Sequence, residues 1–306
     1  MPRIVFSLLL VFYLSLFTDT DSKAGIWIRK DKVKQGEVVL VSGLFFKDKK
    51  QPEIYLEDCF LEFTGKKYPF FLDILNQRSF EGLSERAGFQ FVSRIPTDVF
   101  TKTGTQEIKL QCSNELKKTY LIEVLAEDFP LQEITLTGNK AYLRTTAAAW
   151  QKIRKALASK TERKHWDSSK NWILPNDSRI STPYGVRRKY NGVFAKNYFH
   201  KGIDFAGGLG DLIKAPSSGK VILVGRAADG FHAQGNCIFI DHGQGLVSAY
   251  YHLLKSRVKA GEFVSQGQVI GEIGSTGIST GPHLHFGLYY HEVNINPTYL
   301  FERPFF

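Results

Sequence analysis

The sequence predicts a mainly β protein in which two β domains are joined by a connecting helix. Short apolar runs recur from about residue 25 to 123 and again after Asn171, separated by polar, Gly or Pro turns. Between these two regions lies a stretch rich in Ala, Lys and Arg, a composition typical of a helix. A chain of 306 residues is long enough for two domains of ordinary size.

The first 24 residues have the pattern of a secretory signal peptide. Arg3 precedes an apolar run over residues 4–17, and residues 22–24 (SKA) form a small-x-small cleavage pattern, so we expect cleavage after Ala24. A membrane anchor is the alternative, but this run is shorter than the ~20 apolar residues of a transmembrane helix. We therefore expect export to the periplasm or cell envelope, with no stable membrane span after cleavage.

Residues 25–128 are expected to form a β-sandwich of immunoglobulin-like type. The strand-like runs are EVVLVSGLFF, IYLEDCFLEF, GFQFVSRI and QEIKLQC. An exported chain permits a disulfide between Cys59 and Cys112, and two buried thiols are the alternative. Cys237, in the strand-like run NCIFI, is interpreted as a core residue and not as a nucleophile.

Residues 129–170 are expected to form a linker that contains a helix. Ala148, Ile153, Ala156 and Leu157 recur at helical spacing within it. We interpret this as a solvated structural helix; a basic surface that touches the cell wall is the alternative.

Seven of the eight histidines lie after Asn171, in a second, mostly antiparallel β domain expected over residues 171–306. In GPHLHFGLYY, alternation along a strand places His283 and His285 on one side. Upstream, in YFHKGIDFAGG, the spacing of His200 and Asp204 returns both side chains to one face of an extended segment. These residues supply nitrogen and oxygen donors for a metal such as zinc, with one position left for water.

Each histidine motif also has a purely structural interpretation. An isolated H-x-H is often the polar face of an edge strand, and His252, at the end of the run AYYHLL, would be unremarkable alone. The helical zinc motif H-E-x-x-H is absent; its nearest approach, His291-Glu292, lacks the second histidine. The general base of a zinc hydrolase built from these residues would therefore be a histidine.

Residues 180–300 closely resemble the LytM and lysostaphin type of zinc peptidases, which cleave peptidoglycan cross-links. The resemblance rests on ISTPYGVRR, FHKGIDFAGGLGDLIKAPSSGKVI, GNCIFIDHGQGLVSAYYHL and VKAGEFVSQGQVIGEIGSTGISTGPHLHFGL. It implies an antiparallel β domain of the duplicated hybrid motif type. It also implies one Zn²⁺ per chain, bound by His200, Asp204 and His285.

The resemblance further implies that His252 and His283 flank the attacking water, with the base and stabiliser roles unassigned. A tyrosine, Tyr198 or Tyr190, would stabilise the oxyanion. Loops carrying Tyr184, Tyr198 and Phe199 are expected on one side of a groove, and residues 274–280 on the other. The runs VKQGEVVLV and DFPLQEITL look like the amino-terminal domain of exported bacterial members of this family.

These expectations combine into an exported zinc endopeptidase that hydrolyses peptide cross-links of peptidoglycan. The formal charge of +10 suits an acidic polymer such as a cell wall, whereas the scattered basic residues do not favour nucleic acid. The alternative is a non-catalytic or latent regulator that binds and activates other wall hydrolases. The expected N-terminal domain, residues 25–128, is a candidate binding site for other envelope proteins. The sequence does not decide whether the bond cleaved is a D,D cross-link or a glycine bridge.

Two other functions fit the sequence less well. The segment VKAGEFVSQGQVIGEIG resembles a lipoyl or biotinyl carrier hairpin, but it has no lysine at the turn that carries the modification. A secreted toxin is disfavoured relative to cleavage of the owner's own wall, since no dedicated wall-targeting domain is recognised after the peptidase domain.

Overall fold

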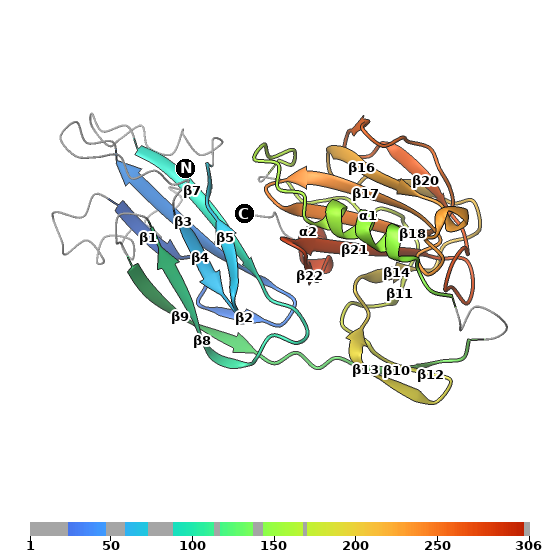
Figure 1. Cartoon of the computed structure of the whole chain (residues 1–306), viewed down its shortest axis with the longest axis horizontal. Helices are drawn as coiled ribbons and strands as arrows, with labels where there is room; N and C mark the ends of the chain where they lie inside the picture. The colour runs from blue at the N-terminus through green and yellow to red at the C-terminus, as the bar shows by residue number, and fades with distance from the viewer. Residues whose placement is uncertain are drawn as a thin grey trace, which may run out of the picture.

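The computed structural model describes residues 24–46, 59–72, 88–112, 117–136, 143–167 and 170–302. Figure 1 shows two β assemblies side by side, and within the described residues almost all regular structure is β, which confirms the mainly β fold class. No helix among these residues is long and apolar enough to cross a membrane. The expected signal peptide lies outside the described residues, apart from Ala24.

Two sheets form the N-terminal part and enclose one core. Their strand orders are β1-β3-β7-β6 and β2-β9-β8-β4-β5, and all neighbours are antiparallel except β2 and β9. Val41 of β3, Ile95 of β7, Leu61 of β4 and Ile108 of β8 are fully buried in the same cluster, so apolar side chains of both sheets meet between them. The strands are β1 (Ala24–Ile28), β2 (Lys32–Lys34), β3 (Val38–Phe46), β4 (Phe60–Phe63), β5 (Lys66–Pro69), β6 (Phe71–Leu72), β7 (Gly88–Pro96), β8 (Gly104–Gln111) and β9 (Lys117–Leu125).

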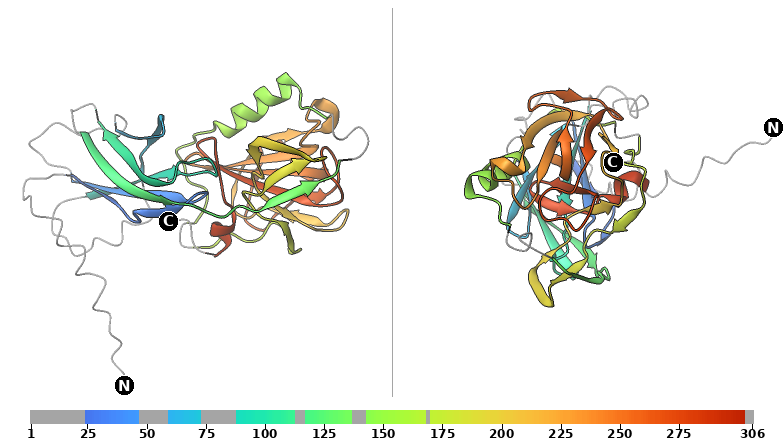
Figure 2. Two further views of the ribbon diagram at one scale, coloured as in Figure 1. Left: turned by 90° about the horizontal axis from the view of Figure 1, so that it is seen from below. Right: turned by 90° about the vertical axis from the view of Figure 1, so that its right-hand side faces the viewer.

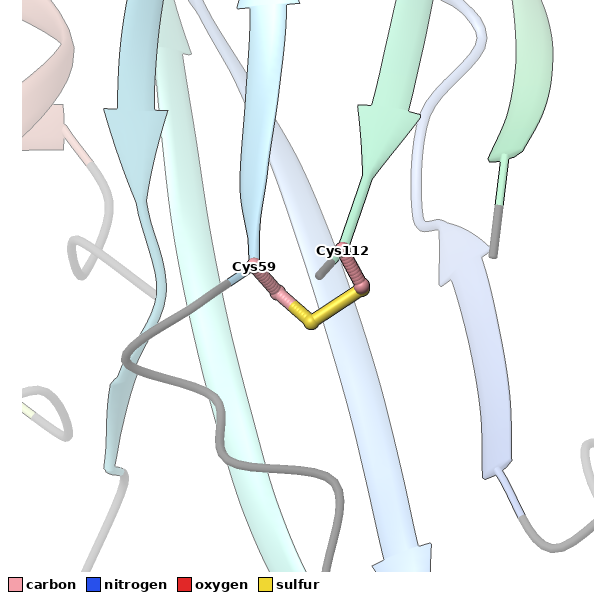
Figure 3. Close-up of a disulfide and its surroundings, with 2 residues drawn as sticks. All are labelled: Cys59 and Cys112. Atoms are coloured by element: carbon pink, nitrogen blue, oxygen red, sulfur yellow. A yellow bond between two sulfur atoms is a disulfide. The ribbon is translucent and has the colours of Figure 1, made fainter. Parts of the chain in front are cut away.

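A disulfide joins neighbouring strands of the second of these sheets. Cys59, directly before β4, is bonded to Cys112, directly after β8, across a sequence separation of 53 residues (Figure 3). Of the two alternatives for this pair, the bridge is therefore the one the structure contains, and it indicates an oxidising compartment outside the cytoplasm. Cys237 is free and buried, and burial raises the pKa of its thiol to about 12, as expected for a core residue.

One large antiparallel sheet forms most of the C-terminal part. Its main order is β11-β14-β21-β18-β17-β16-β19, with β15, β20 and β22 attached at its sides. A small separate sheet, β10-β12-β13, lies beside it (Figure 1). The strands are β10 (Leu131–Ile134), β11 (Ile180–Thr182), β12 (Arg187–Tyr190), β13 (Val193–Phe199), β14 (Ile203–Phe205), β15 (Leu212–Lys214), β16 (Gly219–Gly225), β17 (Asn236–Gly243), β18 (Leu246–Ser256), β19 (Phe263–Val264), β20 (Val269–Ile273), β21 (Leu284–Tyr290) and β22 (Val293–Ile295).

Helix α1 (Ala147–Leu157) lies across one face of the large sheet (Figures 1 and 2). Thr146 caps it by accepting a hydrogen bond from the Ala149 amide, and Ala149, Ile153 and Ala156 pack on β17, β18 and β21. The expected helix is therefore present, but its buried face begins at Ala149; Ala148 is exposed. Short helical turns, α2 (Thr298–Glu302) and η5 (Ala227–Asp229), complete the described structure.

Polar and aromatic side chains connect the two parts of the chain. The buried Arg94 guanidinium of β7 donates to the side-chain oxygen of Gln244, 3.1 Å away. His291, in the turn between β21 and β22, stacks on Phe71 at a ring separation of 6.0 Å and meets Tyr68 edge-on. Both His291 ring nitrogens are buried without a hydrogen-bond partner among the described residues. The contact therefore requires a neutral imidazole.

We predict that the disulfide stabilises the N-terminal part by about 4 kcal/mol, the value expected for closing a loop of 53 residues in the unfolded chain. A urea titration followed by circular dichroism, with and without reductant, measures this difference. The double variant Cys59→Ala/Cys112→Ala is the control and should not respond to reductant. Equal stability of the native protein in both conditions would contradict the prediction.

His291 should make folding sensitive to acid. Burial, reinforced by Lys160 and Arg94, lowers its pKa to about 4 from the ordinary 6.5. Between pH 6.5 and pH 4, His291 is therefore protonated in the unfolded chain and neutral in the folded chain. The free energy of unfolding has its full value above pH 6.5 and decreases as the pH falls toward 4. At pH 5 the loss should be about 2 kcal/mol.

The matched variant is His291→Asn, because residue 291 has a φ of +46°, which asparagine tolerates, and asparagine does not titrate. The smaller asparagine side chain leaves a cavity that lowers stability at every pH. The quantity to compare is therefore the change in the free energy of unfolding between pH 7.5 and pH 5. That change should shrink by about 2 kcal/mol relative to the native chain. An identical pH dependence in both proteins would show that His291 is not responsible.

Candidate metal centre

Three neighbouring strands place Asp204, His285 and Tyr251 side by side in one cross-strand row. Asp204 of β14 lies opposite His285 of β21, and Tyr251 of β18 lies opposite His285 on its other side. Because side chains alternate along a strand, His285 faces the cavity while Leu284 and Phe286 enter the core of the large sheet. Tyr251 stacks on the His285 ring at 5.1 Å, nearly parallel to it.

His200 reaches this row from the preceding strand. It directly follows β13, and residues 200–202 form a short non-strand segment before β14 begins at Ile203. The spacing of His200 and Asp204 predicted one continuous extended segment, so this expectation was wrong. The break lies where Gly202 passes β21: a Cβ at this position would be 2.2 Å from the Phe286 carbonyl oxygen. The side chains of His200 and Asp204 still converge, as expected.

One donor atom from each of three side chains meets at a single point. His200 Nε2, Asp204 Oδ1 and His285 Nδ1 each lie 2.9 Å from the other two. All three residues are buried, and they form the one group of potential metal ligands found in the described part of the chain. The side chains expected as ligands are therefore together.

The protonation of this group favours a cation. His200 Nδ1 lies 2.8 Å from the Pro183 carbonyl oxygen, which can only accept, so in the neutral ring it is Nε2 that carries the lone pair. Burial would raise the pKa of Asp204, but His200 and His285 outweigh it and hold that pKa well below its usual range. Burial also lowers the pKa of His285 to about 4.

A lone pair on His200 and a carboxylate oxygen of Asp204 repel one another at this separation unless a proton or cation lies between them. Two nitrogens and one oxygen are the donor set of a catalytic zinc site, in which each ligand lies 2.0–2.2 Å from the metal, roughly. A tetrahedral ion with such bonds separates its ligands by about 3.4 Å, close to the observed triangle. The three residues therefore fit a small divalent cation.

His252 and His283 lie beside this triangle. Their rings are 4.7 Å apart, and His283 Nε2 is 4.0 Å from Asp204 Oδ1. Each ring donates from Nδ1 to a backbone carbonyl, Thr276 for His252 and Gly281 for His283, at 2.8 and 2.9 Å. In the neutral form, each ring therefore keeps its lone pair on Nε2.

The backbone of His252 explains its orientation. Its φ of +64° breaks the alternation of β18, so that Tyr251 and His252 line the same cavity while Leu253 returns to the core. A histidine in this left-handed conformation is uncommon and is held here by the bond from its amide to Gln234 O at 2.9 Å. Burial, with His283 adding to it, lowers the pKa of His252 to about 3.

Both tyrosines named from the sequence line this cavity. Tyr198 and Tyr190 have ring centroids 6.2 Å apart. Burial raises the pKa of Tyr198 well above its usual value, so its hydroxyl stays protonated. Two other expected groove residues are elsewhere: Tyr184, which donates to Asn294 O at 3.0 Å, and Phe199 are both buried in the core.

The cavity continues beyond the histidines as a groove of about 1190 Å³. This exceeds the roughly 300–1,000 Å³ of small-molecule sites and suits a longer substrate. Ile278 and Ser279 line one part of it, in agreement with the expected loop at residues 274–280. Strand β10 and helix α1 line another part, including Ile134 and Trp150, and this contribution from the linker was not anticipated.

Sequence reasoning also missed two residues in contact with the ligand triangle. Tyr251 precedes His252 in AYYHLL, and strand pairing with β21 would have pointed to it. Arg188 lies 3.4 Å from Asp204 Oδ2 through its Nη2 atom. No motif connects ISTPYGVRR with Asp204, so only the fold could show this contact.

Comparison with known proteins places these features in a family. Residues 198–297 match the model of peptidase family M23. The chain is similar to the DD-carboxypeptidase/endopeptidase Mpg of Neisseria meningitidis, with 36% identity over 120 residues, 39% of this chain and 26% of that protein. It is also similar to lysostaphin of Staphylococcus staphylolyticus, with 46% identity over 88 residues, 28% of this chain and 18% of lysostaphin.

A solved structure from Pseudomonas aeruginosa that carries the peptidase M23 name has the same overall fold. Its TM-score is 0.57 at 23% identity, and the alignment covers 85% of this chain and 93% of the other. Two curated relatives that the chain matches over 124 and 125 residues are covered over only 25% and 32% of their length. The family match is confined to the C-terminal part of the chain: residues 198–297 match peptidase family M23, of the lysostaphin and LytM type, and an additional N-terminal part precedes them.

Proposed function

We propose that this protein is an exported, zinc-dependent endopeptidase that hydrolyses peptide cross-links of peptidoglycan. The observation that carries the proposal is the triangle of His200 Nε2, Asp204 Oδ1 and His285 Nδ1 in the wall of a long groove. The family match and the name of the Neisseria relative, a DD-carboxypeptidase/endopeptidase, support the reaction and the substrate class.

The three triangle residues would hold Zn²⁺, each through the atom that faces the other two. Zinc, when bound, supplies a Lewis acid for the scissile carbonyl and an acidified water as nucleophile. Burial keeps His252 neutral, and the Nε2 atoms of both His252 and His283 are free of backbone bonds because each ring donates from Nδ1. One of them takes a proton from the attacking water and returns it to the leaving amine, a role worth about 10²- to 10⁴-fold in rate.

Tyr198 is the candidate for the oxyanion stabiliser. Its hydroxyl remains protonated at neutral pH, so it can donate a hydrogen bond to negative charge that develops on the carbonyl oxygen. Tyr190, its neighbour in the cavity, accepts from Arg188 at 3.3 Å and is the alternative.

We further propose the domain division given by the sequence: a signal peptide over 1–24, an immunoglobulin-like sandwich over 25–128, a linker over 129–170 and the peptidase domain over 171–306. The disulfide and the two-sheet core support an exported sandwich, located in the periplasm or cell envelope. This domain would position the peptidase or bind another envelope protein.

Digestion of purified peptidoglycan tests the activity. The chain from Gly25 onward should release cross-linked dimers as monomers, and a zinc chelator should abolish this release. Mass spectrometry of the fragments identifies the bond, D,D cross-link or glycine bridge. Intact dimers after treatment with zinc-loaded protein would instead favour the regulator that binds and activates other wall hydrolases.

Two substitutions separate metal binding from proton transfer. His285→Ala should lose both zinc and activity, because it removes a ligand, whereas His252→Ala should keep zinc and lose about 10²- to 10⁴-fold in kcat. Zinc content and kcat are measured on the same preparations. Normal turnover by His252→Ala would remove this residue from the mechanism.

A further inference from the structure

Arg188 is a largely buried cation next to the triangle and lies outside the residues that match the family model. Its side chain is only 12% exposed, and Nε has no hydrogen-bond partner among the described residues. Burial of a guanidinium is costly unless the charge is paired. The contacts of the Arg188 guanidinium must therefore offset the cost of burying its charge.

The contacts of Arg188 divide the two oxygens of Asp204 between different partners. Oδ1 lies 2.9 Å from both His200 Nε2 and His285 Nδ1, whereas Oδ2 lies 3.4 Å from Arg188 Nη2. Arg188 also donates from Nη1 to the Tyr190 hydroxyl at 3.3 Å. The guanidinium therefore spans from the ligand carboxylate to the tyrosine side of the cavity.

An irregularity in strand pairing sets the direction of the Arg188 side chain. Arg187 pairs with Phe199 and Lys189 pairs with Phe194, so the register of β12 and β13 shifts at Arg188. Such irregularities redirect a side chain relative to a regular ladder. On its other side, Arg188 pairs with Gln132 of β10, so the linker strand holds β12 in place.

We propose that Arg188 is a positioning residue that holds Oδ2 of Asp204 and leaves Oδ1 alone to bind the metal. This proposal rests on the proposed zinc site. A carboxylate without such a partner can rotate and bind zinc through both oxygens, which would occupy the position that water and the substrate carbonyl need. Arg188 therefore maintains both the affinity for zinc and the open coordination position.

The test compares zinc affinity, with Arg187 as a matched control. Arg187 is the adjacent residue of β12, and it donates to Lys196 O at 3.1 Å and lies over the rings of Phe100 and Phe194. Arg188→Met should lower zinc affinity by about 10- to 100-fold, the usual effect of losing a partner of a metal ligand. Arg187→Met should bind zinc as the native chain does.

Two further measurements distinguish positioning from a general loss of structure. The absorption spectrum of the Co²⁺-loaded protein reports coordination number, and Arg188→Met should change it while Arg187→Met should not. Arg188→Lys keeps the charge without the planar fork and should lie between the native chain and Arg188→Met in zinc affinity. It also serves as the test variant if Arg188→Met does not fold.

Native affinity and an unchanged cobalt spectrum in the Arg188 variants would overturn the proposal while leaving the zinc site intact. Failure of the native chain to bind zinc would overturn the proposed function itself. The two failures are therefore distinguishable on the same set of proteins.

Discussion

The pairing of β21 between β14 and β18 is the constraint on which the site depends. It places Asp204, His285 and Tyr251 in one cross-strand row, and the same alternation sends Leu284 and Phe286 into the core. A shift of one residue in this register would turn His285 into the apolar core and turn Leu284 and Phe286 toward the cavity. The free energy of burying one face thus holds the ligand residues on the other.

Burial of the site has an electrostatic consequence. His252 and His285 are kept neutral because desolvation disfavours their charged forms, and Asp204 is kept charged by the histidines around it. Neutral imidazoles and a carboxylate are the forms that bind a metal or accept a proton. The surrounding hydrophobic core therefore prepares the protonation state of the site as well as its geometry.

The part of the chain before the family domain contributes directly to the groove. Strand β10 pairs with β12 and so supports Arg188, and helix α1 covers the sheet next to the cavity. Two contacts connect the N-terminal sheets to this part of the chain: Arg94 bonds to Gln244 in the turn before β18, and Phe71 stacks on His291 in the turn after β21. Changes in the linker can therefore alter the groove without touching any ligand residue.

Much of the site could be predicted because its residues lie in local motifs. His283 and His285 are separated by one residue, and His200 and Asp204 by three, so alternation and the resemblance were enough to group them. The helix was predicted at the right place, with Ile153 and Ala156 correctly on its buried face; only Ala148 was wrong, since Ala148 and Ala149 are indistinguishable by hydrophobicity. Tyr184 and Phe199 were misplaced because aromatic residues suit a core and a groove equally well.

The sequence by itself determined the identity of the histidines and aspartate, the β character of the chain and the strand period that orients His283 and His285. Only the tertiary structure decided the disulfide, the left-handed turn at His252, the Arg188 contact and the linker's place in the groove. The physical reason is distance along the chain. Periodicity and motif spacing describe residues a few positions apart, whereas pairing between remote strands depends on how the whole core is packed.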